Sequence, residues 1–364
     1  MDFQYILRNF KLECDNWQFL GQSELLGGHI NNTYLLETQL GDQARRYVLQ
    51  KINVSVFKQP VQLMENIVRV TAFLREKFAA GHAPGQTTLQ VFPTHDGLDY
   101  YIDNDGAYWR CYQYVENSYS PQEPTEVDAY RAGHAFGTFM QLLNDFPAEQ
   151  LHETIPNFHN TVARYEQLQE AITNNAAGRL GDVTEEIAFA QARQADCGKL
   201  LALLEAGQIP MRVTHNDTKL NNVLFDKDTQ QAVCVIDFDT IMPGLALYDY
   251  GDALRFLGNT AREDERDTDC VQFAMPLFEA YTKGYLDAAK DALTPAELAM
   301  LPFSIKLMSL ECGMRFLADY LNGDVYFRIH SPDHNLVRCR TQFKLVREIE
   351  ARLGDMEVFV ASLT

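Results

Sequence analysis

The sequence predicts an α+β protein in two parts, an N-terminal antiparallel sheet with one helix followed by a larger, mainly helical part. Two observations predict this division. Short strand-like segments separated by turn signals fill residues 17–115. After Glu116, apolar residues recur at three- and four-residue spacing over most of the chain. We therefore expect two domains, 1–115 and 116–364.

The strand-like segments of the first part are bounded by Gly-Asp, His-Asp-Gly and Asn-Asp-Gly turn signals, which are typical of antiparallel strands. These segments are 32–40, 46–53, 89–94, 98–103 and 108–116. One further segment, 61–80, carries Met64, Ile67 and Val68 at roughly helical spacing. The first part is therefore expected to be a small sheet with one helix.

Helices are expected over most of the second part. Residues 121–146 open with prolines and an acidic first turn, as helices commonly do. The other expected helices are 158–176, 185–205, 267–288, 295–321 and 335–352. The polar run 260–269 is expected to be a solvated loop and the start of a helix.

Composition excludes several classes of partner. Of 364 residues, 50 are Asp or Glu and 31 are Lys or Arg, which gives a formal charge of −19. Such a charge is unfavourable for binding a nucleic acid or an anionic membrane. Seven scattered cysteines without a C-x-x-C pair fit a reducing cytoplasm. The first residues lack a signal-peptide pattern, so we expect a cytoplasmic protein of open oligomeric state.

The most informative segment is THNDTKLNNVLFD at 214–226, followed by VIDFD at 235–239. A short hairpin between them would bring Asp217, Asn222 and Asp237 together. Phosphoryl transfer requires a carboxylate beside the acceptor hydroxyl and oxygen ligands for Mg²⁺, which these side chains supply. The alternative is a polar turn in which Asp217 and Asn222 satisfy backbone N–H groups. The combined pattern favours function, because Asp and Asn are costly in apolar, β-rich surroundings unless they bind something.

Each polar residue of this pattern has an expected role. Asp217 is the candidate base, and Asn222 and Asp237 are the candidate metal ligands. Lys219 is placed to reach the transferred phosphoryl group, although a solvated lysine is an open alternative. Asp239 is expected to orient substrate or bind a second metal.

The segment after this pattern limits the acceptor. Only nine residues separate Asp239 from Asp249, and no Ala-Pro-Glu motif follows, so a protein kinase's activation segment has no room. The acceptor is therefore expected to be small. Asp249 and Asp252 precede a predicted helix, where capping and loop bracing are their expected tasks. His215 is expected to brace the loop through hydrogen bonds.

These motifs resemble the aminoglycoside phosphotransferase and choline kinase family, small-molecule kinases of bilobal, protein-kinase-like fold. HINNTY at 29–34, LQKIN at 49–53, FDTIMPG at 238–244 and LYDYGDALRF at 247–256 are similar to the bacterial N-acetylhexosamine 1-kinases. The resemblance implies ATP-dependent phosphorylation of the anomeric hydroxyl of N-acetylglucosamine or N-acetylgalactosamine. It also implies an N-terminal lobe that binds the nucleotide, with Mg²⁺ as the metal.

In such a lobe, a strand lysine binds the phosphates and a helix glutamate orients it, and Lys51 and Glu65 fit these roles. Glu76 on the same helix is the alternative to Glu65. Gly27 and Gly28 can admit phosphate close to the backbone, although a plain hairpin turn stays open. The chain has no G-x-x-x-x-G-K-[ST] motif, which disfavours a Walker-type NTPase.

Adenine is expected to pair with backbone groups of the segment containing Gln113 and Val115. For the acceptor, the resemblance points to His29, Arg315 and Tyr326. Taken singly, Arg315 could instead be a buried ion-pair partner and Tyr326 an ordinary core aromatic residue.

Two other functions stay open. One is a kinase of another small alcohol, similar to aminoglycoside or choline kinases, and Arg315 argues against its cationic substrates. The other is a catalytically inactive nucleotide-binding module, against which the retention of Lys51, Asp217, Asn222 and Asp237 argues.

Overall fold

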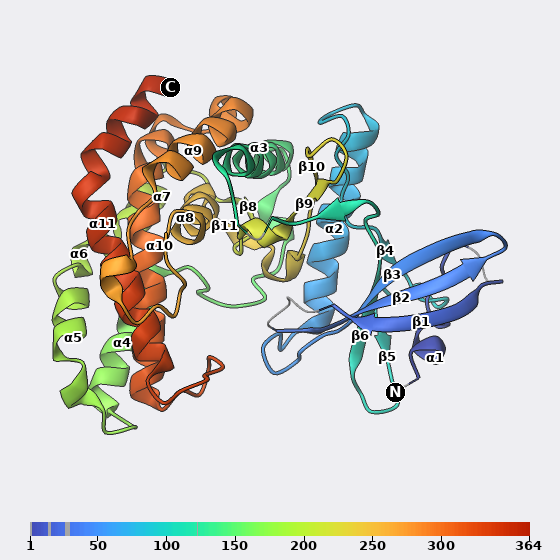
Figure 1. Ribbon diagram of the computed structural model, residues 1–364, viewed down its shortest axis with the longest axis horizontal. Helices are drawn as coiled ribbons and strands as arrows, with labels where there is room; N and C mark the ends of the chain where they lie inside the picture. Colours follow the sequence, from blue (N-terminus) through green and yellow to red (C-terminus); the bar gives the residue numbers. More distant parts are fainter. Residues whose placement is uncertain (1, 14–15, 26–29, 122) are drawn as a thin grey trace. The chain divides into compact units, whose positions relative to one another are not determined.

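The computed structural model describes residues 2–13, 16–25, 30–121 and 123–364 (Figure 1). The chain forms two compact units. The first comprises Met1–Tyr119, Glu149–Ile155 and Leu224–Met242, and the second comprises Ser120–Ala148, Pro156–Val223 and Pro243–Thr364. The first unit thus contains the strand-rich part of the sequence together with a later segment that carries Asp237 and Asp239.

The first unit contains an antiparallel sheet with the order β1-β2-β3-β6-β4, and β5 pairs with β6. Its strands are β1 Gln18–Glu24, β2 Asn32–Leu40, β3 Gln43–Lys51, β4 Val91–Phe92, β5 Tyr101–Ile102 and β6 Tyr108–Gln113. The β2–β3 hairpin turns at Gly41, whose φ of 58° suits glycine. The five expected strands are confirmed, whereas β1 and the short helix α1, Phe3–Leu7, were not predicted.

Helix α2, Pro60–Ala79, confirms the single helix expected in this part. Proline at its start is compatible with the first helical turn, and Leu63, Ile67 and Val70 are fully buried. The buried Asn66 side chain of α2 donates to the backbone oxygens of His152 at 2.8 Å and Ile241 at 3.0 Å. Its oxygen accepts the His152 N–H at 2.8 Å. The Asn66 side chain therefore connects α2 to both later segments of this unit, Glu149–Ile155 and Leu224–Met242.

A second, smaller sheet in this unit has the order β10-β9-β7. Its strands are β7 Ser118–Tyr119, β9 Val223–Asp226 and β10 Ala232–Val235. The Asp226 carboxylate accepts the Thr229 N–H at 2.7 Å, which stabilises the tight turn between β9 and β10. The hairpin expected between the two acidic motifs is therefore confirmed.

The second unit is mainly helical, and α10 lies at its core beside α4, α8 and α11 (Figure 1). Its helices are α3 Glu126–Leu142, α4 Thr161–Asn174, α5 Thr184–Gln191, α6 Gln194–Cys197, α7 Lys199–Glu205, α8 Ala246–Leu257, α9 Met275–Ala289, α10 Pro295–Asn322 and α11 His334–Leu363. Strands β8, Arg212–Thr214, and β11, Met242–Gly244, pair with each other. No helix in the described ranges is long and apolar enough to cross a membrane.

Three expected helices have different bounds. The segment 185–205 is divided among α5, α6 and α7. The helix expected from 267 begins at Met275, after a single 3₁₀ turn, and the last helix continues to Leu363. The prediction that Asp249 and Asp252 precede a helix was wrong, since α8 begins at Ala246 and contains both.

Helices α3 and α9 pack closely because glycines lie at their contact (Figure 1). A Cβ atom added at Gly133 would lie 2.1 Å from the Tyr281 carbonyl oxygen, and one added at Gly284 would lie 2.0 Å from the Tyr130 carbonyl oxygen. Because these neighbours are backbone atoms, no side-chain rotation relieves the clash. The helices can approach this closely only with glycine at both positions.

We expect Gly284→Ala to lower the free energy of unfolding by at least ~1–3 kcal/mol, the usual cost of overpacking a core. Urea titration of the purified protein measures this. Gly354→Ala in α11 is the control, because its added Cβ meets no atom within 4 Å and alanine favours a helix. Equal unfolding free energies for both variants would contradict the close contact.

Candidate active site

The loop that carries Asp217 follows β8 and ends in a 3₁₀ turn, Leu220–Asn222. Asn216 has a positive φ of 63°, a left-handed conformation that Asn adopts more readily than most residues. His215 and Asn216 are both buried. Buried backbone in an irregular loop needs hydrogen-bond partners, and the neighbouring helices supply them.

Asp249 of α8 holds this loop from one side. Its carboxylate accepts the His215 N–H at 2.8 Å and the Asn216 N–H at 2.7 Å. Its backbone oxygen accepts the Thr218 hydroxyl at 2.5 Å. Loop bracing by Asp249 is therefore confirmed, although the carboxylate acts from within a helix.

His159 holds the same loop from another direction, since its Nε2 lies 3.1 Å from the Asn216 carbonyl oxygen. Its Nδ1 lies 2.8 Å from Glu311 of α10. Neither residue was predicted from the sequence. A signal existed for Glu311, because an acid on the apolar stretch of a helix usually has a buried partner. His159 offered no comparable signal.

The loop brings together three predicted residues, Asp217, Lys219 and Asn222. Lys219 Nζ lies 2.8 Å from Asp217 Oδ1. The Asn222 amide nitrogen donates to the Asp217 backbone oxygen at 2.7 Å and lies 3.3 Å from Asp217 Oδ2. Burial raises the pKa of Asp217, but the Lys219 ammonium outweighs it and holds this pKa below its usual value. The Asp217 carboxylate is thus ionised at neutral pH and can accept a hydrogen bond.

Two predicted nucleotide-binding residues of the first unit have other partners here. Lys51, the last residue of β3, has its ammonium 5.9 Å from the centre of the Trp109 ring. The Glu65 carboxylate of α2 lies 2.5 Å from His152 Nε2 and 3.5 Å from Arg69. The expected Lys51–Glu65 ion pair is therefore absent from the described part of the chain.

Asp239 differs from its prediction. It is 4% exposed and lies in a 3₁₀ turn rather than on an extended strand. Its Oδ1 lies 2.5 Å from the buried Arg110 guanidinium, and Asn31 donates to its Oδ2. Arg110, which was not predicted, also donates to Gln50 at 2.9 Å. The expected extended strand is therefore corrected to a turn that this carboxylate anchors to the sheet, and its role toward substrate or a second metal stays a prediction.

Asp237, two residues earlier, is exposed and has a positive φ of 65°. Such backbone conformations cost energy in residues other than glycine and often occur at functional sites. An exposed carboxylate in this conformation fits the expected metal ligand.

The segment expected to bind adenine follows β6. The Gln113 N–H donates to the Gln90 oxygen at 3.0 Å, and the Val115 oxygen accepts the Ser118 hydroxyl at 2.7 Å. The Val115 N–H has no acceptor among the described residues. Val115 therefore offers a donor to a ligand, whereas the Gln113 N–H is already used. The predicted Gly27, Gly28 and His29 lie outside the described residues.

Arg315 and Tyr326 are brought together in the second unit. The Arg315 guanidinium carbon lies 5.3 Å from the ring centre of Phe158, 6.0 Å from that of Tyr326 and 5.6 Å from that of Phe327. Among the described residues, no carboxylate forms an ion pair with Arg315. Tyr326 is 59% exposed. Arg315 is therefore not the partner of a buried ion pair in the described residues, and Tyr326 is not a core aromatic residue.

The loop that carries Tyr326 is fixed by Asp319, one helical turn after Arg315 on α10. The Asp319 carboxylate is buried and accepts the N–H groups of Val325 at 2.9 Å, Tyr326 at 2.8 Å and Phe327 at 2.9 Å. Arg315 and Tyr326 are therefore both positioned by α10.

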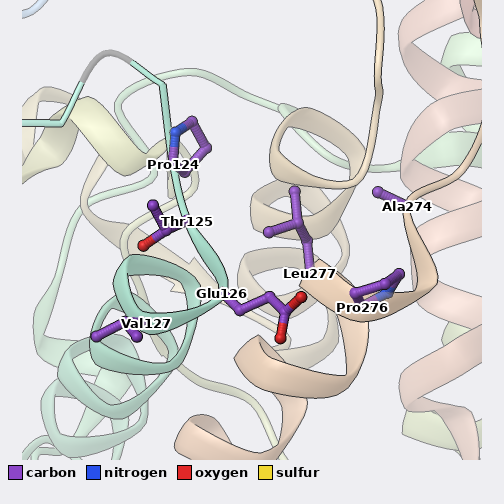
Figure 2. A pocket seen from close by; sticks show the side chains of 7 residues that line it. All are labelled: Pro124, Thr125, Glu126, Val127, Ala274, Pro276 and Leu277. Atoms are coloured by element: carbon purple, nitrogen blue, oxygen red, sulfur yellow. The ribbon is translucent and has the colours of Figure 1, made fainter.

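Two hollows of the second unit differ in their distance along the chain from the Asp217 loop. One, of about 510 Å³, lies between the starts of α3 and α9 and contains a single charged side chain, Glu126 (Figure 2). Another, of about 700 Å³, borders the loop at Leu220 and Asn221 and includes the Arg255–Glu263 ion pair. Only the second adjoins the Asp217 loop.

An antiparallel sheet with one helix, a helical second part and a clamped Asp217–Asn222 loop define the class of protein-kinase-like phosphotransferases. The family model described as the phosphotransferase enzyme family matches residues 21–293. The chain belongs to this family, whose members are small-molecule kinases.

Similar solved structures support the fold. They include a microcompartment-associated aminopropanol kinase, with 20% identity, 97% of each chain covered and a TM-score of 0.62. The ethanolamine kinase of Plasmodium vivax has 13% identity, with 93% of this chain and 86% of that chain covered and a TM-score of 0.57. Spectinomycin phosphotransferase, in complex with ADP and spectinomycin, has 12% identity, with 96% and 98% covered and a TM-score of 0.58. At these identities the likeness shows the fold alone.

The Asp249 clamp predicts a pH dependence of stability. Burial raises the pKa of Asp249 to about 6, although the backbone N–H groups and His215 oppose this. The folded state therefore binds this proton more tightly than the unfolded state, and stability from this group falls as pH rises from about 4 to about 6. Between pH 4 and 7, we expect the free energy of unfolding of the wild type to fall by roughly 3 kcal/mol more than that of Asp249→Asn.

Urea titrations at several pH values measure this difference. Asp355→Asn, at an exposed position of α11, should follow the wild-type pH dependence. Parallel curves for wild type and Asp249→Asn would contradict the raised pKa.

Proposed function

We propose that the chain is an ATP-dependent kinase that phosphorylates the anomeric hydroxyl of N-acetylglucosamine or N-acetylgalactosamine. The observation that carries this proposal is the occurrence, in one unit, of an ionised and rigidly held Asp217 and of Arg315, a cation that forms no ion pair with a described carboxylate. Asp217 supplies the base for phosphoryl transfer. Arg315 limits the chemical class of the acceptor.

In the proposed reaction, the acceptor hydroxyl oxygen attacks the γ-phosphorus of ATP, and the bond from this phosphorus to the oxygen bridging to the β-phosphorus breaks. Asp217 accepts a hydrogen bond from the hydroxyl and takes its proton late in the transfer. The Lys219 ammonium, 2.8 Å from Asp217, keeps that carboxylate ionised and adds positive charge near the transferred group. ADP leaves with the electron pair of the broken bond.

The residues proposed to bind the nucleotide are chemically suited to it. Asn222 directly precedes β9 and Asp237 follows β10 in the sequence, and we assign their oxygens to Mg²⁺, which prefers oxygen ligands. When bound, the ion would neutralise charge on the phosphates. Lys51 is assigned to the phosphates and the Val115 N–H to adenine.

The charge around Arg315 supports a neutral acceptor. The pKa of Arg164 is lowered, first by burial and then by the nearby positive charge of Arg315. Two guanidinium groups therefore share this region of an otherwise acidic protein. The aminopropanol and ethanolamine kinases of similar fold are named for amino alcohols, which are cations at neutral pH. An ammonium group cannot accept a hydrogen bond from Arg315, whereas sugar hydroxyl and acetamide oxygens can.

An acceptor panel tests the proposed substrate class. We expect ATP consumption with N-acetylglucosamine or N-acetylgalactosamine, and no consumption with ethanolamine, choline or 1-amino-2-propanol. Phosphorus NMR of the product should show a phosphate coupled to the anomeric proton. Turnover of only the amino alcohols would overturn the sugar assignment. ATP binding without turnover of any acceptor would identify a nucleotide-binding module.

Asp217→Asn should lower kcat by roughly 10²-fold or more, because the acceptor hydroxyl loses its base. ATP affinity, measured by isothermal titration calorimetry, should be nearly unchanged. Asp355→Asn, which removes an exposed carboxylate elsewhere, should retain full kcat. A wild-type kcat for Asp217→Asn would refute the role of this residue.

Arg315→Gln should raise the KM for the N-acetylhexosamine by about 10-fold, the effect of losing one to two hydrogen bonds from a charged donor. Steady-state kinetics with ATP saturating measures this. Arg328→Gln, on the exposed stretch that follows Phe327, is the matched control and should keep the wild-type KM. Equal effects of the two substitutions would remove Arg315 from the acceptor site.

A further inference from the structure

A buried pair of polar side chains, His159 and Glu311, contacts the Asp217 loop through Asn216. His159 is 7% exposed and Glu311 is 1% exposed. His159 Nδ1 lies 2.8 Å from Glu311 Oε1, and Thr161 donates its hydroxyl hydrogen to Glu311 Oε2 at 2.6 Å. On its other side, His159 Nε2 lies 3.1 Å from the Asn216 carbonyl oxygen. The ring thus bridges α10 and the residue directly before Asp217.

The partners of His159 fix the orientation of its ring. The Asn216 carbonyl oxygen can only accept a hydrogen bond, so Nε2 is the ring nitrogen that donates to it. Nδ1 faces the Glu311 carboxylate. Burial raises the pKa of Glu311, but His159 and Arg315 outweigh it and hold this pKa below its usual value. The ring is therefore held on both sides, by α10 and by the Asp217 loop.

Arg315 and two aromatic rings surround this pair. Arg315 lies one turn along α10 from Glu311 and favours the carboxylate. The Tyr248 ring of α8 lies 5.5 Å from the His159 ring, and Phe158 lies 4.5 Å from it. The pKa of Tyr248 is raised well above neutrality by burial, so this phenol stays uncharged.

The peptide groups on both sides of Asn216 are held by these contacts. Asp249 accepts the Asn216 N–H, and His159 donates to the Asn216 oxygen, which belongs to the peptide leading into Asp217. Loss of the His159 donor would remove this hydrogen bond from the buried Asn216 peptide. Rotation of the peptide would then become easier, and it would turn the Asp217 side chain.

We propose that His159 and Glu311 are positioning residues for phosphoryl transfer, which fix the Asn216–Asp217 peptide and thereby aim the Asp217 carboxylate at the acceptor hydroxyl. This role rests on the function proposed above. Neither side chain touches the substrate. Because Glu311 and Arg315 occupy neighbouring turns of α10, one rigid helix positions both the base and the acceptor-binding cation.

Two substitutions of His159 separate positioning from general structural support. The glutamine amide nitrogen can occupy the place of Nε2, so His159→Gln retains the donor to Asn216, whereas the shorter His159→Asn does not reach it. We expect His159→Asn to lower kcat by about 10–100-fold, since misplacement by about 1 Å can cost 10²-fold. The KM values for ATP and acceptor should change less than threefold. His159→Gln should restore most of kcat.

The same variants have a readout that needs no turnover. Backbone amide NMR shifts of Asn216 and Asp217 should move in His159→Asn and return toward wild type in His159→Gln. If no acceptor is turned over by the wild type but these shifts behave as described, the proposed function fails and the positioning geometry stands. If the wild type is active and His159→Asn keeps its kcat, the positioning role is overturned and the function stands.

Glu311→Gln covers the case in which His159→Asn does not fold. This substitution keeps the side-chain shape but removes the negative charge opposite His159, and we expect kcat to fall by about 3–10-fold with unchanged KM values. A lowered melting temperature combined with wild-type kcat in Glu311→Gln would show a purely structural role and overturn the proposal.

Discussion

The structure around Asp217 depends on the buried hydrogen bonds that hold the backbone of His215 and Asn216. An irregular, buried loop is unstable without partners for its N–H and C=O groups. The Asp249 carboxylate accepts both N–H groups, and His159 donates to the carbonyl oxygen. These bonds stabilise the left-handed conformation of Asn216, which in turn determines the direction of the Asp217 side chain.

Under the proposed function, the same helical unit also selects the acceptor. The chain has a formal charge of −19, yet Arg315 lies among aromatic rings and forms no ion pair with a carboxylate in the described ranges. The N–H donors of Arg315 are assigned to oxygen atoms of a neutral sugar. The ammonium group of an amino alcohol could not accept them.

Local features were predictable from the sequence, and long-range partners were not. Turn signals and periodicity predicted the main strands, α2 and α10, and the Asp217–Asn222 spacing predicted the loop. The start of helix α8 was placed too late because Leu245 gives no capping signal before it. The contact of Asp239 with Arg110 was not predicted, because Arg110 belongs to a distant strand. The His159–Glu311 contact spans 152 residues and leaves no local pattern.

Amide hydrogen exchange of His215 and Asn216 tests the central claim most directly, since Asp249 is proposed to protect both N–H groups. We predict exchange as slow as that of core amides in α10, and much faster exchange in Asp249→Asn. Exchange as fast as that of the exposed β9–β10 turn, or protection unchanged by the substitution, would show that this clamp does not hold the Asp217 loop.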